Sequence, residues 1–237
     1  MTPSSTDGRL RALPLYEPIR SHEGDERTYA TPVGKCPSVT TVLSGSRDQS
    51  GLEAWRESVG PERADFISSY ACFRGSGHHL NIENLLKYGI EPAYSFSTTP
   101  YWKSTRPFLD TIDHPLLMEG ALWHPDGFAG TFDCIAYLAG DGDQPTLLDW
   151  KTADTIRKPD KMYEYSLQVS AYVAAANYVY GTMGLNITRA KIVVAIPDES
   201  PQIEDLDARA LEQYFKHFQA RLQRFTHARS KKRGGKS

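Results

Sequence analysis

The hydrophobic pattern predicts helices in the first and last parts of the chain. Before residue 90, apolar residues recur at helical spacing, so we expect helices at about residues 52–59 and 62–88, separated at Gly60-Pro61. Gly75 is a second candidate break in this region. A closing helix is expected at about residues 206–228. Its buried stripe would consist of Leu211, Phe215, Phe218, Leu222 and Phe225.

Strand-like segments fill the centre of the chain, where apolar residues alternate or run together. These segments are residues 116–123, 128–138, 146–152 and 190–196. A helix at about residues 163–180 separates the last two. Residues 37–43 fit either a short strand or the start of a helix, and residues 89–115 are expected to be irregular apart from a short helix near 107–112. This order predicts an α/β sandwich in which helices flank a mixed central sheet.

The length of 237 residues fits one domain with short extensions, because single domains commonly reach about 200–250 residues. We expect an extended or partly ordered arm at residues 1–35, one domain at 36–228 and a basic tail at 229–237. The whole chain has a net charge of −2, whereas residues 1–228 hold 22 basic and 29 acidic residues, a net charge of −7. A basic tail is typical of a solvated chain end, and it also raises nonspecific affinity for nucleic acid.

Composition argues against several classes of protein. Cys36, Cys72 and Cys134 are widely separated, which argues against a disulfide framework, a zinc ribbon and a self-contained iron–sulfur site. The longest uninterrupted apolar run, residues 171–176, is far shorter than the roughly 20 residues that cross a membrane. The first residues lack the pattern of a signal or transit peptide, so we expect a cytoplasmic location and no membrane partner.

The chemically informative feature is a charged pair inside an apolar strand. Side chains two positions apart on a strand share a face, so Asp149 and Lys151 should project together. Leu148 and Trp150 should point to the other side. An isolated Asp-x-Lys pair is most often an ordinary ion pair on a solvated strand, so the neighbouring strand decides how this pair is interpreted.

The same rule places Thr131 and Asp133 on one face of segment 128–138, with Phe132 and Cys134 on the opposite face. If residues 140–145 connect neighbouring strands, two carboxylates and an amine converge. Burying such charges is costly unless they are paired or bound to a metal. Carboxylate oxygens are ligands that Mg²⁺ and Mn²⁺ prefer, and a nearby amine can stabilise charge on a reacting phosphate. The pattern therefore predicts phosphodiester hydrolysis.

Four segments, in order along the chain, resemble the RecB-type exonucleases of the PD-(D/E)XK nuclease superfamily. They are Arg74-Gly-Ser-Gly-His-His79-x-x-x-Glu83, Gly130-Thr-Phe-Asp133, Leu147-Leu-Asp149-Trp-Lys151-Thr152 and Gln168-x-x-x-Tyr172. The Gln-x-x-x-Tyr element marks the RecB-type branch. The likeness covers roughly residues 36–228 and is closer to the group of mitochondrial genome maintenance exonucleases and related phage exonucleases.

The resemblance implies a PD-(D/E)XK restriction-endonuclease-like α/β sandwich and a deoxyribonuclease that depends on Mg²⁺ or Mn²⁺. The implied metal ligands are His79, Asp133, Asp149 and the main-chain carbonyl of Trp150. Lys151 would be the catalytic amine, while Gln168 and Tyr172 would orient the site and hold the scissile phosphate or its neighbour. Glu119 and Glu83 are further acidic candidates for the site.

The substrate implied by the resemblance is DNA that is single-stranded or has free ends, and the helical residues 47–88 would lie over the active site. Candidate DNA-binding residues are Arg74, Arg157, Lys158 and Lys161. A single-strand annealing or replication protein is a candidate partner, in replication, recombination or repair within a bacterial or phage-infected cell. We expect no iron–sulfur cluster, since no cysteine triplet follows Cys134, and no bound nucleotide, since no Gly-rich phosphate loop is present.

Two alternatives stay open. A catalytically silent DNA-binding accessory subunit would share the fold, although loss of an acidic or basic site residue would be its expected signature. A restriction-type endonuclease would share the Asp…Asp-x-Lys core, but it would seldom carry the Gln-x-x-x-Tyr helix. Cleavage of closed circular DNA would favour the endonuclease, and a requirement for a free end would favour the exonuclease.

Overall fold

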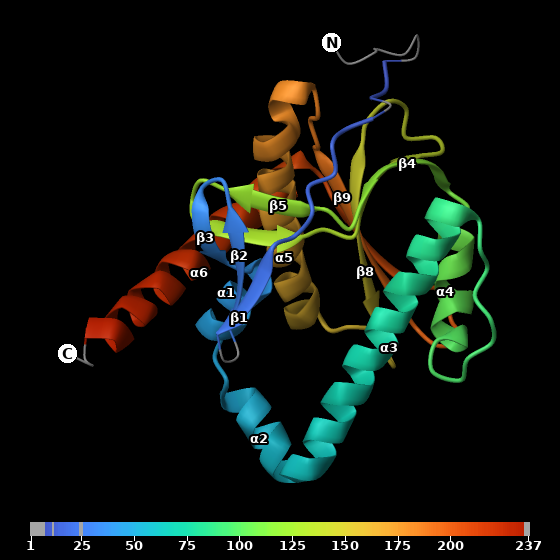
Figure 1. The fold of residues 1–237 in the computed structure, drawn as a ribbon. Helices are drawn as coiled ribbons and strands as arrows, with labels where there is room; N and C mark the ends of the chain where they lie inside the picture. The colour runs from blue at the N-terminus through green and yellow to red at the C-terminus, as the bar shows by residue number, and fades with distance from the viewer. Residues whose placement is uncertain (1–7, 11, 24–25, 235–237) are drawn as a thin grey trace.

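Five strands form the mixed central sheet of the computed structural model, which describes residues 8–10, 12–23 and 26–234 (Figure 1). They are β4 (Ile112–Met118), β7 (Cys134–Leu138), β8 (Thr146–Thr152), β9 (Arg189–Ala195) and β10 (Gln202–Leu206). Their order across the sheet is β10-β9-β8-β7-β4. Strands β8 and β9 are parallel, and the other neighbours are antiparallel. The prediction of an α/β fold with a mixed central sheet is therefore confirmed.

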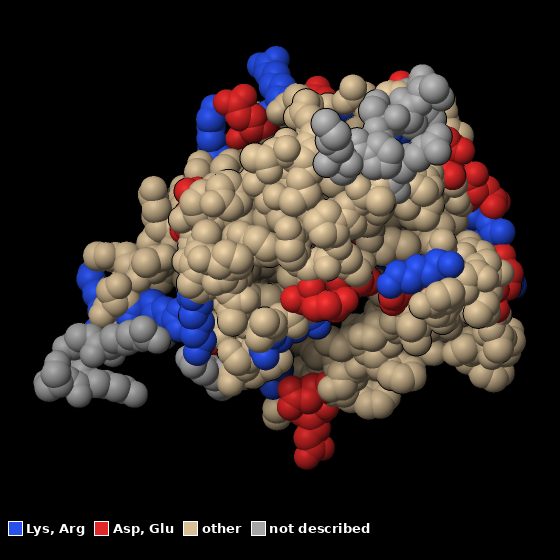
Figure 2. All heavy atoms as spheres, turned by 45° about the horizontal axis from the view of Figure 1, so that its top comes forward, with Lys and Arg blue, Asp and Glu red and all other residues tan. Residues whose placement is uncertain are grey.

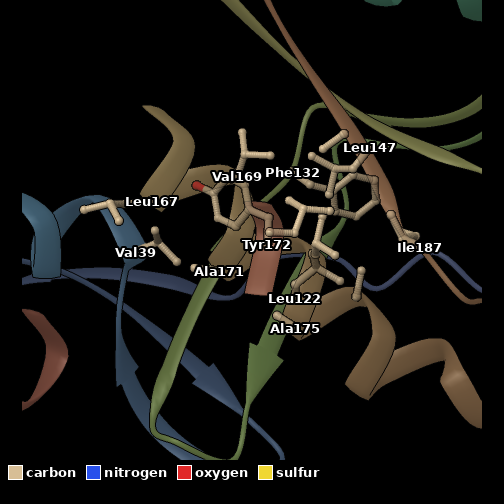
Figure 3. Close-up of a cluster of buried hydrophobic side chains, with 14 of the residues drawn as sticks. Val39, Leu122, Phe132, Leu147, Leu167, Val169, Ala171, Tyr172, Ala175 and Ile187 are labelled. Atoms are coloured by element: carbon tan, nitrogen blue, oxygen red, sulfur yellow. The ribbon is translucent and has the colours of Figure 1, made fainter. Parts of the chain in front are cut away.

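Helices cover both faces of this sheet, because its strands carry apolar side chains in both directions. These helices are α1 (Val39–Ser46), α3 (Pro61–Tyr88), α4 (Thr99–Leu109), α5 (Pro159–Tyr180) and α6 (Ala208–Gly234). Leu147 of β8 packs in a cluster with residues of α1, α5 and α6, part of which is shown in Figure 3. Leu148 and Trp150 pack on the other face with Ile82 of α3 and Trp102 of α4. The predicted orientation of the β8 side chains is thus confirmed.

A second, antiparallel sheet precedes α1 in the chain and lies to one side of the central sheet (Figure 1). It consists of β1 (Arg20–Glu23), β2 (Glu26–Thr31) and β3 (Gly34–Pro37). This N-terminal sheet contacts a two-stranded ribbon of β5 (Ala121–His124) and β6 (Phe128–Thr131), and Tyr29, Cys36 and Ala129 fill the interface. The second half of the segment expected to be an arm is therefore built into the fold, while residues 1–7, 11 and 24–25 lie outside the described residues.

Helices α2 (Ser50–Val59) and α3 form a V-shaped arm at one side of the molecule (Figure 1). They meet at Gly60, as predicted, where φ is 83°, a value that glycine adopts without steric strain. Helix α3 continues through Gly75 without a break. No residue of α2 is buried, whereas Arg74, His78 and Ile82 in the second half of α3 are. The arm is thus anchored to the body through the second half of α3.

Two segments predicted as continuous strands are broken, and the breaks shape the site. Segment 116–123 divides at Glu119-Gly120 into β4 and β5, and segment 128–138 divides at Phe132-Asp133 into β6 and β7. Phe132 and Cys134 lie in different apolar clusters, so the prediction that they share a face was wrong. The chain passes so close to itself here that a Cβ atom on Gly120 would lie 2.8 Å from the Phe132 ring. The β5–β6 ribbon therefore turns away from the central sheet.

Other differences concern element boundaries. Helix α4 replaces the short helix expected near 107–112, and β4 already begins at Ile112. Strand β10 was not predicted, and α6 runs into the predicted basic tail as far as Gly234. Segment 37–43, which fitted either a strand or a helix, contains the start of helix α1. The side chain of Ser38 accepts a hydrogen bond from the Thr41 amide and caps this helix.

Within the described part of the chain, no helix has the length and apolar character needed to cross a membrane.

Candidate active site

A cavity of about 430 Å³ lies where the N-terminal sheet, α3, β8 and α5 meet. Its lining includes His79, Glu119, Asp133, Lys151, Gln168 and Tyr172. Acidic and basic side chains meet around a hollow on one face of the molecule (Figure 2). The cavity therefore gathers polar groups from segments that lie far apart in the sequence, as the four-segment pattern predicts.

Three potential metal ligands converge at one side of this cavity. The Nδ1 atom of His79 lies 3.5 Å from Oδ1 of Asp133 and 4.0 Å from Oε1 of Glu119. One ligand atom from each residue lies within 4.8 Å of the other two. The three residues come from α3, from the turn between β4 and β5, and from the turn between β6 and β7. The two strand breaks thus bring the acidic residues to the histidine.

The imidazole of His79 is oriented by the main chain of β8. Its Nε2 atom lies 2.9 Å from the carbonyl oxygen of Trp150. A carbonyl can only accept, so Nε2 carries a proton in this contact, and Nδ1 is the ring nitrogen that faces Asp133 and Glu119. A hydrogen bond of this kind fixes both the tautomer and the ring orientation of metal-binding histidines. Here the Trp150 carbonyl therefore orients His79.

The conformation of the two acidic residues is fixed by backbone contacts. The Trp150 amide donates to Oδ2 of Asp133 at 2.8 Å, which ties the start of β7 to β8. The Glu119 amide donates to the main-chain oxygen of Asp133 at 3.1 Å. Glu119 has φ of 56°, in the left-handed region that side-chain-bearing residues seldom adopt. Such a conformation persists only where the surroundings enforce it, and it is often found at functional sites.

A second group of side chains continues from the cluster along β8 and α5. Asp149 is fully buried and forms an ion pair with Lys151 on the same strand face. Gln168 donates to Oδ1 of Asp149 at 3.3 Å and lies 3.4 Å from the Tyr172 hydroxyl. The Tyr172 ring packs against the backbone of Gly130, where a Cβ atom would lie 2.5 Å from the ring. These contacts connect the Gln-x-x-x-Tyr helix to the Asp-x-Lys strand.

Burial and nearby negative charge raise the pKa of the Glu119 and Asp149 carboxyl groups. Burial, reinforced by Asp133, raises the pKa of Glu119 to about 7. Burial also raises the pKa of Asp149 to about 6, although Lys151 opposes the shift. Burial would lower the pKa of Lys151, but Asp149 and Asp133 outweigh it and raise that pKa above its usual value. Lys151 is therefore positively charged at neutral pH, and the acidic residues favour an additional cation.

The donor set fits a divalent metal ion. His79, Glu119 and Asp133 supply one imidazole nitrogen and two carboxylates within a cavity that is open to solvent. Hard oxygen donors suit Mg²⁺ and Mn²⁺, while an imidazole also suits other transition metals, so these residues alone do not select one ion. Asp149 lies outside the three-residue cluster and is held by Lys151 and Gln168. Glu83 lines the same cavity and pairs with Lys87 at 2.5 Å.

The residues expected to bind DNA do not line the cavity. Arg74 is 5% exposed and forms an ion pair with Asp154 at 2.7 Å, and its guanidinium lies over the Tyr101 ring. Arg157 is partly buried and contacts the main-chain oxygen of Thr152. Lys158 and Lys161 are exposed at the start of α5. Arg74 thus anchors α3 to the body instead of facing the cavity.

Sequence reasoning missed the contribution of the N-terminal sheet to the cavity. Arg20, Arg27 and Tyr29 line the wall opposite α3, together with Thr40 of α1. The segment was interpreted as an arm because scattered proline, glycine and charge obscured its strands. The alternation of Arg27, Tyr29 and Thr31 with smaller residues was the available strand signal, but nothing local links it to residues 133–172.

No model of a known protein family matches the chain, and no curated protein matches its sequence.

Proposed function

We propose that this chain is a metal-dependent DNA exonuclease with a RecB-type PD-(D/E)XK fold. The observation that carries the proposal is the Asp149–Lys151 pair on β8, because Lys151 lines the same cavity as the His79–Glu119–Asp133 cluster and Asp149 lies buried behind it. The resemblance that motivates the family assignment rests on residues of α3, β6–β7, β8 and α5, and each segment contributes to the cavity lining. A mixed sheet with helices on both faces is compatible with the sandwich that the resemblance implies.

Mg²⁺ or Mn²⁺ would be held by His79, Glu119 and Asp133, with Asp149 adjacent. The bound ion would supply Lewis-acid stabilisation of the scissile phosphate and a lowered pKa of attacking water. The raised pKa values of Glu119 and Asp149 support this assignment, because a cation would relieve the repulsion between the carboxylates. The donor set alone would accept other divalent ions, so the choice of Mg²⁺ or Mn²⁺ rests on the resemblance.

Lys151 would stabilise the negative charge that develops on the phosphate oxygens during in-line attack. Its ion pair with Asp149 holds the amine at the cavity wall, and the raised pKa keeps it protonated. Gln168 fixes Asp149 through its hydrogen bond and also contacts the Tyr172 hydroxyl. These residues would therefore position the amine and the carboxylate before the substrate arrives.

The arm of α2 and α3 favours a substrate with unpaired bases. Phe66, Tyr70 and Phe73 are exposed on α3, about two to four turns before His79, and the Phe66 and Tyr70 rings stack on one another. Exposed aromatic side chains offer stacking platforms to the bases of single strands. We therefore propose single-stranded ends as the preferred substrate, and a role in DNA replication, recombination or repair.

A cleavage assay separates this proposal from its alternatives. End-labelled single-stranded DNA, matched duplex and closed circular DNA would each be incubated with Mg²⁺, Mn²⁺ or EDTA. We expect metal-dependent loss of linear strands, with circles spared. Cleavage of circles would instead indicate an endonuclease. A gel shift without cleavage in either metal would indicate a DNA-binding accessory subunit.

A further inference from the structure

Two arginines of the N-terminal sheet face the cavity from the wall opposite α3. In the β1–β2 register, Arg20 is paired with Tyr29, so both side chains leave the sheet on the same side. Arg27 lies two positions before Tyr29 on β2 and shares that side. All three residues line the cavity. The strand geometry therefore places two guanidinium groups on one wall.

Neither arginine is neutralised by an acidic side chain among the described residues. Arg20 donates from Nη2 to the Thr131 hydroxyl at 2.7 Å, and its guanidinium lies 5.8 Å from the centre of the Tyr29 ring. Arg27 donates from Nη2 to the Thr40 hydroxyl at 2.7 Å, while its Nε atom is buried without a hydrogen-bond partner. Threonine hydroxyls orient a guanidinium without cancelling its charge. The remaining N–H donors stay available for an anion.

The two arginines share the cavity with the acidic residues Glu119 and Asp133, which also belong to its lining. The charge of Arg20 partly offsets the rise in the pKa of Glu119, and the charge of Arg27 partly offsets the rise in the pKa of Tyr172. The cavity thus combines the basic groups of the N-terminal sheet with the acidic groups of the proposed metal site. If one phosphate of a DNA strand were held at the proposed metal site, a neighbouring phosphate could contact Arg20 and Arg27.

We propose that Arg20 and Arg27 form a phosphate-binding subsite that holds the phosphodiester adjacent to the scissile one. The inference rests on the proposed nuclease function, and it adds a positioning role for the N-terminal sheet. Guanidinium groups bind phosphate oxygens through charge-assisted hydrogen bonds, which are stronger than neutral ones and geometrically specific. A strand held at both phosphates would be fixed in register with Lys151, so the subsite would determine which bond is cut.

Binding and cleavage would be measured separately in four variants: Arg20→Gln, Arg27→Gln, the double variant, and Arg27→Lys as the conservative replacement. Arg209→Gln, in an exposed position on α6, is the matched control. Affinity for a fluorescein-labelled single-stranded oligodeoxynucleotide would be followed by anisotropy in EDTA, where no metal-dependent cleavage can occur. Values of kcat and KM would be measured in Mg²⁺, and melting temperatures would verify folding. Because Arg20 is exposed, Arg20→Gln remains informative if Arg27→Gln fails to fold.

We expect each single substitution to weaken binding and raise KM about tenfold, as loss of one charge-assisted hydrogen bond predicts, with a smaller effect on kcat. Arg27→Lys should recover part of the affinity, and Arg209→Gln should behave as wild type. Wild-type affinity and KM in the folded Arg20→Gln and double variants would overturn the subsite while leaving the nuclease proposal standing. Loss of binding in the double variant of a protein that never cuts DNA would support phosphate binding by the two arginines, but it would overturn the nuclease proposal and with it a role in choosing the bond that is cut. A wild-type protein that neither binds nor cuts DNA would overturn both.

Discussion

The Nε2 atom of His79 lies 2.9 Å from the carbonyl oxygen of Trp150, which leaves Nδ1 directed at Asp133 and Glu119. The Trp150 amide also donates to Asp133. The backbone of this one residue of β8 therefore orients both His79 and Asp133. The proposed metal site would therefore be pre-organised before an ion binds, because the ring cannot rotate without losing its hydrogen bond. The first prediction follows from this contact.

Replacing His79 should weaken metal binding without unfolding the protein. We expect His79→Ala to lower Mn²⁺ affinity at least tenfold, since the nitrogen ligand is lost while both carboxylates remain. Isothermal titration with Mn²⁺ measures this directly. His114→Ala, on the exposed part of β4, serves as the control and should titrate as wild type. Unchanged Mn²⁺ affinity in His79→Ala would remove this histidine from the proposed site.

Metal affinity should depend on pH through Glu119, whose pKa is raised to about 7 by burial and by Asp133. Below this pH the carboxyl group is protonated and cannot bind a cation, so affinity should rise as the pH increases from 6 to 8. Glu119→Gln removes the titrating group and should flatten this dependence while lowering affinity at pH 8. Mn²⁺ titrations of both proteins at several pH values provide the comparison. A wild-type dependence retained in Glu119→Gln would assign the titration to another group.

Stability should fall in acid because His78 is buried in its neutral form. Burial, reinforced by the neighbouring His79, lowers the pKa of His78 to about 3 from the usual value near 6.5. Between these two pH values, His78 is therefore protonated in the unfolded chain and neutral in the folded chain. The contribution of His78 is complete above about pH 6.5 and is lost between pH 6.5 and 3, at a slope of about 1.4 kcal/mol per pH unit.

Urea unfolding of the metal-free protein between pH 4 and 8 would measure that slope. His78→Gln should be less stable at pH 7, because it disturbs the contact with Thr105, but its stability should vary less steeply with pH. Equal slopes for wild type and His78→Gln would show that other groups cause the acid sensitivity.

Gly130 should be intolerant of a side chain, because a Cβ atom there would lie 2.5 Å from the Tyr172 ring. Gly130→Ala would push Tyr172 away from Gln168, at a cost of about 1–3 kcal/mol in stability for overpacking a buried site. Gly181→Ala is the matched control, since its backbone is helical and no atom lies within 4 Å of the added carbon. We expect reduced thermal stability and slower DNA cleavage only in Gly130→Ala. Equal melting temperatures and rates for the two variants would contradict this account.

The sequence predicted strand β8 to the residue, and with it the shared face of Asp149 and Lys151. The prediction succeeded because apolar residues alternate with Asp149 and Lys151 directly after the turn residues 140–145, which leaves little choice of element or face. The junction of α2 and α3 was equally clear, since Gly60-Pro61 ends one helix and begins the next.

The breaks at Glu119-Gly120 and Phe132-Asp133 could not be predicted. The local sequence does not reveal that these two segments of the chain lie against each other at Gly120 and Phe132. The burial of Arg74 was missed for a related reason. Its partners Asp154 and Tyr101 are distant in sequence, and an arginine on a helix normally reaches solvent. Both failures concern tertiary contacts that override a local pattern.

The proposed function requires the Asp149–Lys151 pair for metal-dependent DNA cleavage. The most direct test compares wild type, Asp149→Asn and Lys151→Ala in the hydrolysis of end-labelled single-stranded DNA with Mg²⁺. Asp198→Asn and Lys216→Ala, both at exposed positions, are matched controls for charge and chemistry. We predict cleavage by wild type and both controls, and a loss of at least about 100-fold in both site variants with DNA binding retained in Lys151→Ala. Turnover retained in either site variant, or no cleavage by wild type in Mg²⁺ or Mn²⁺, would contradict the account.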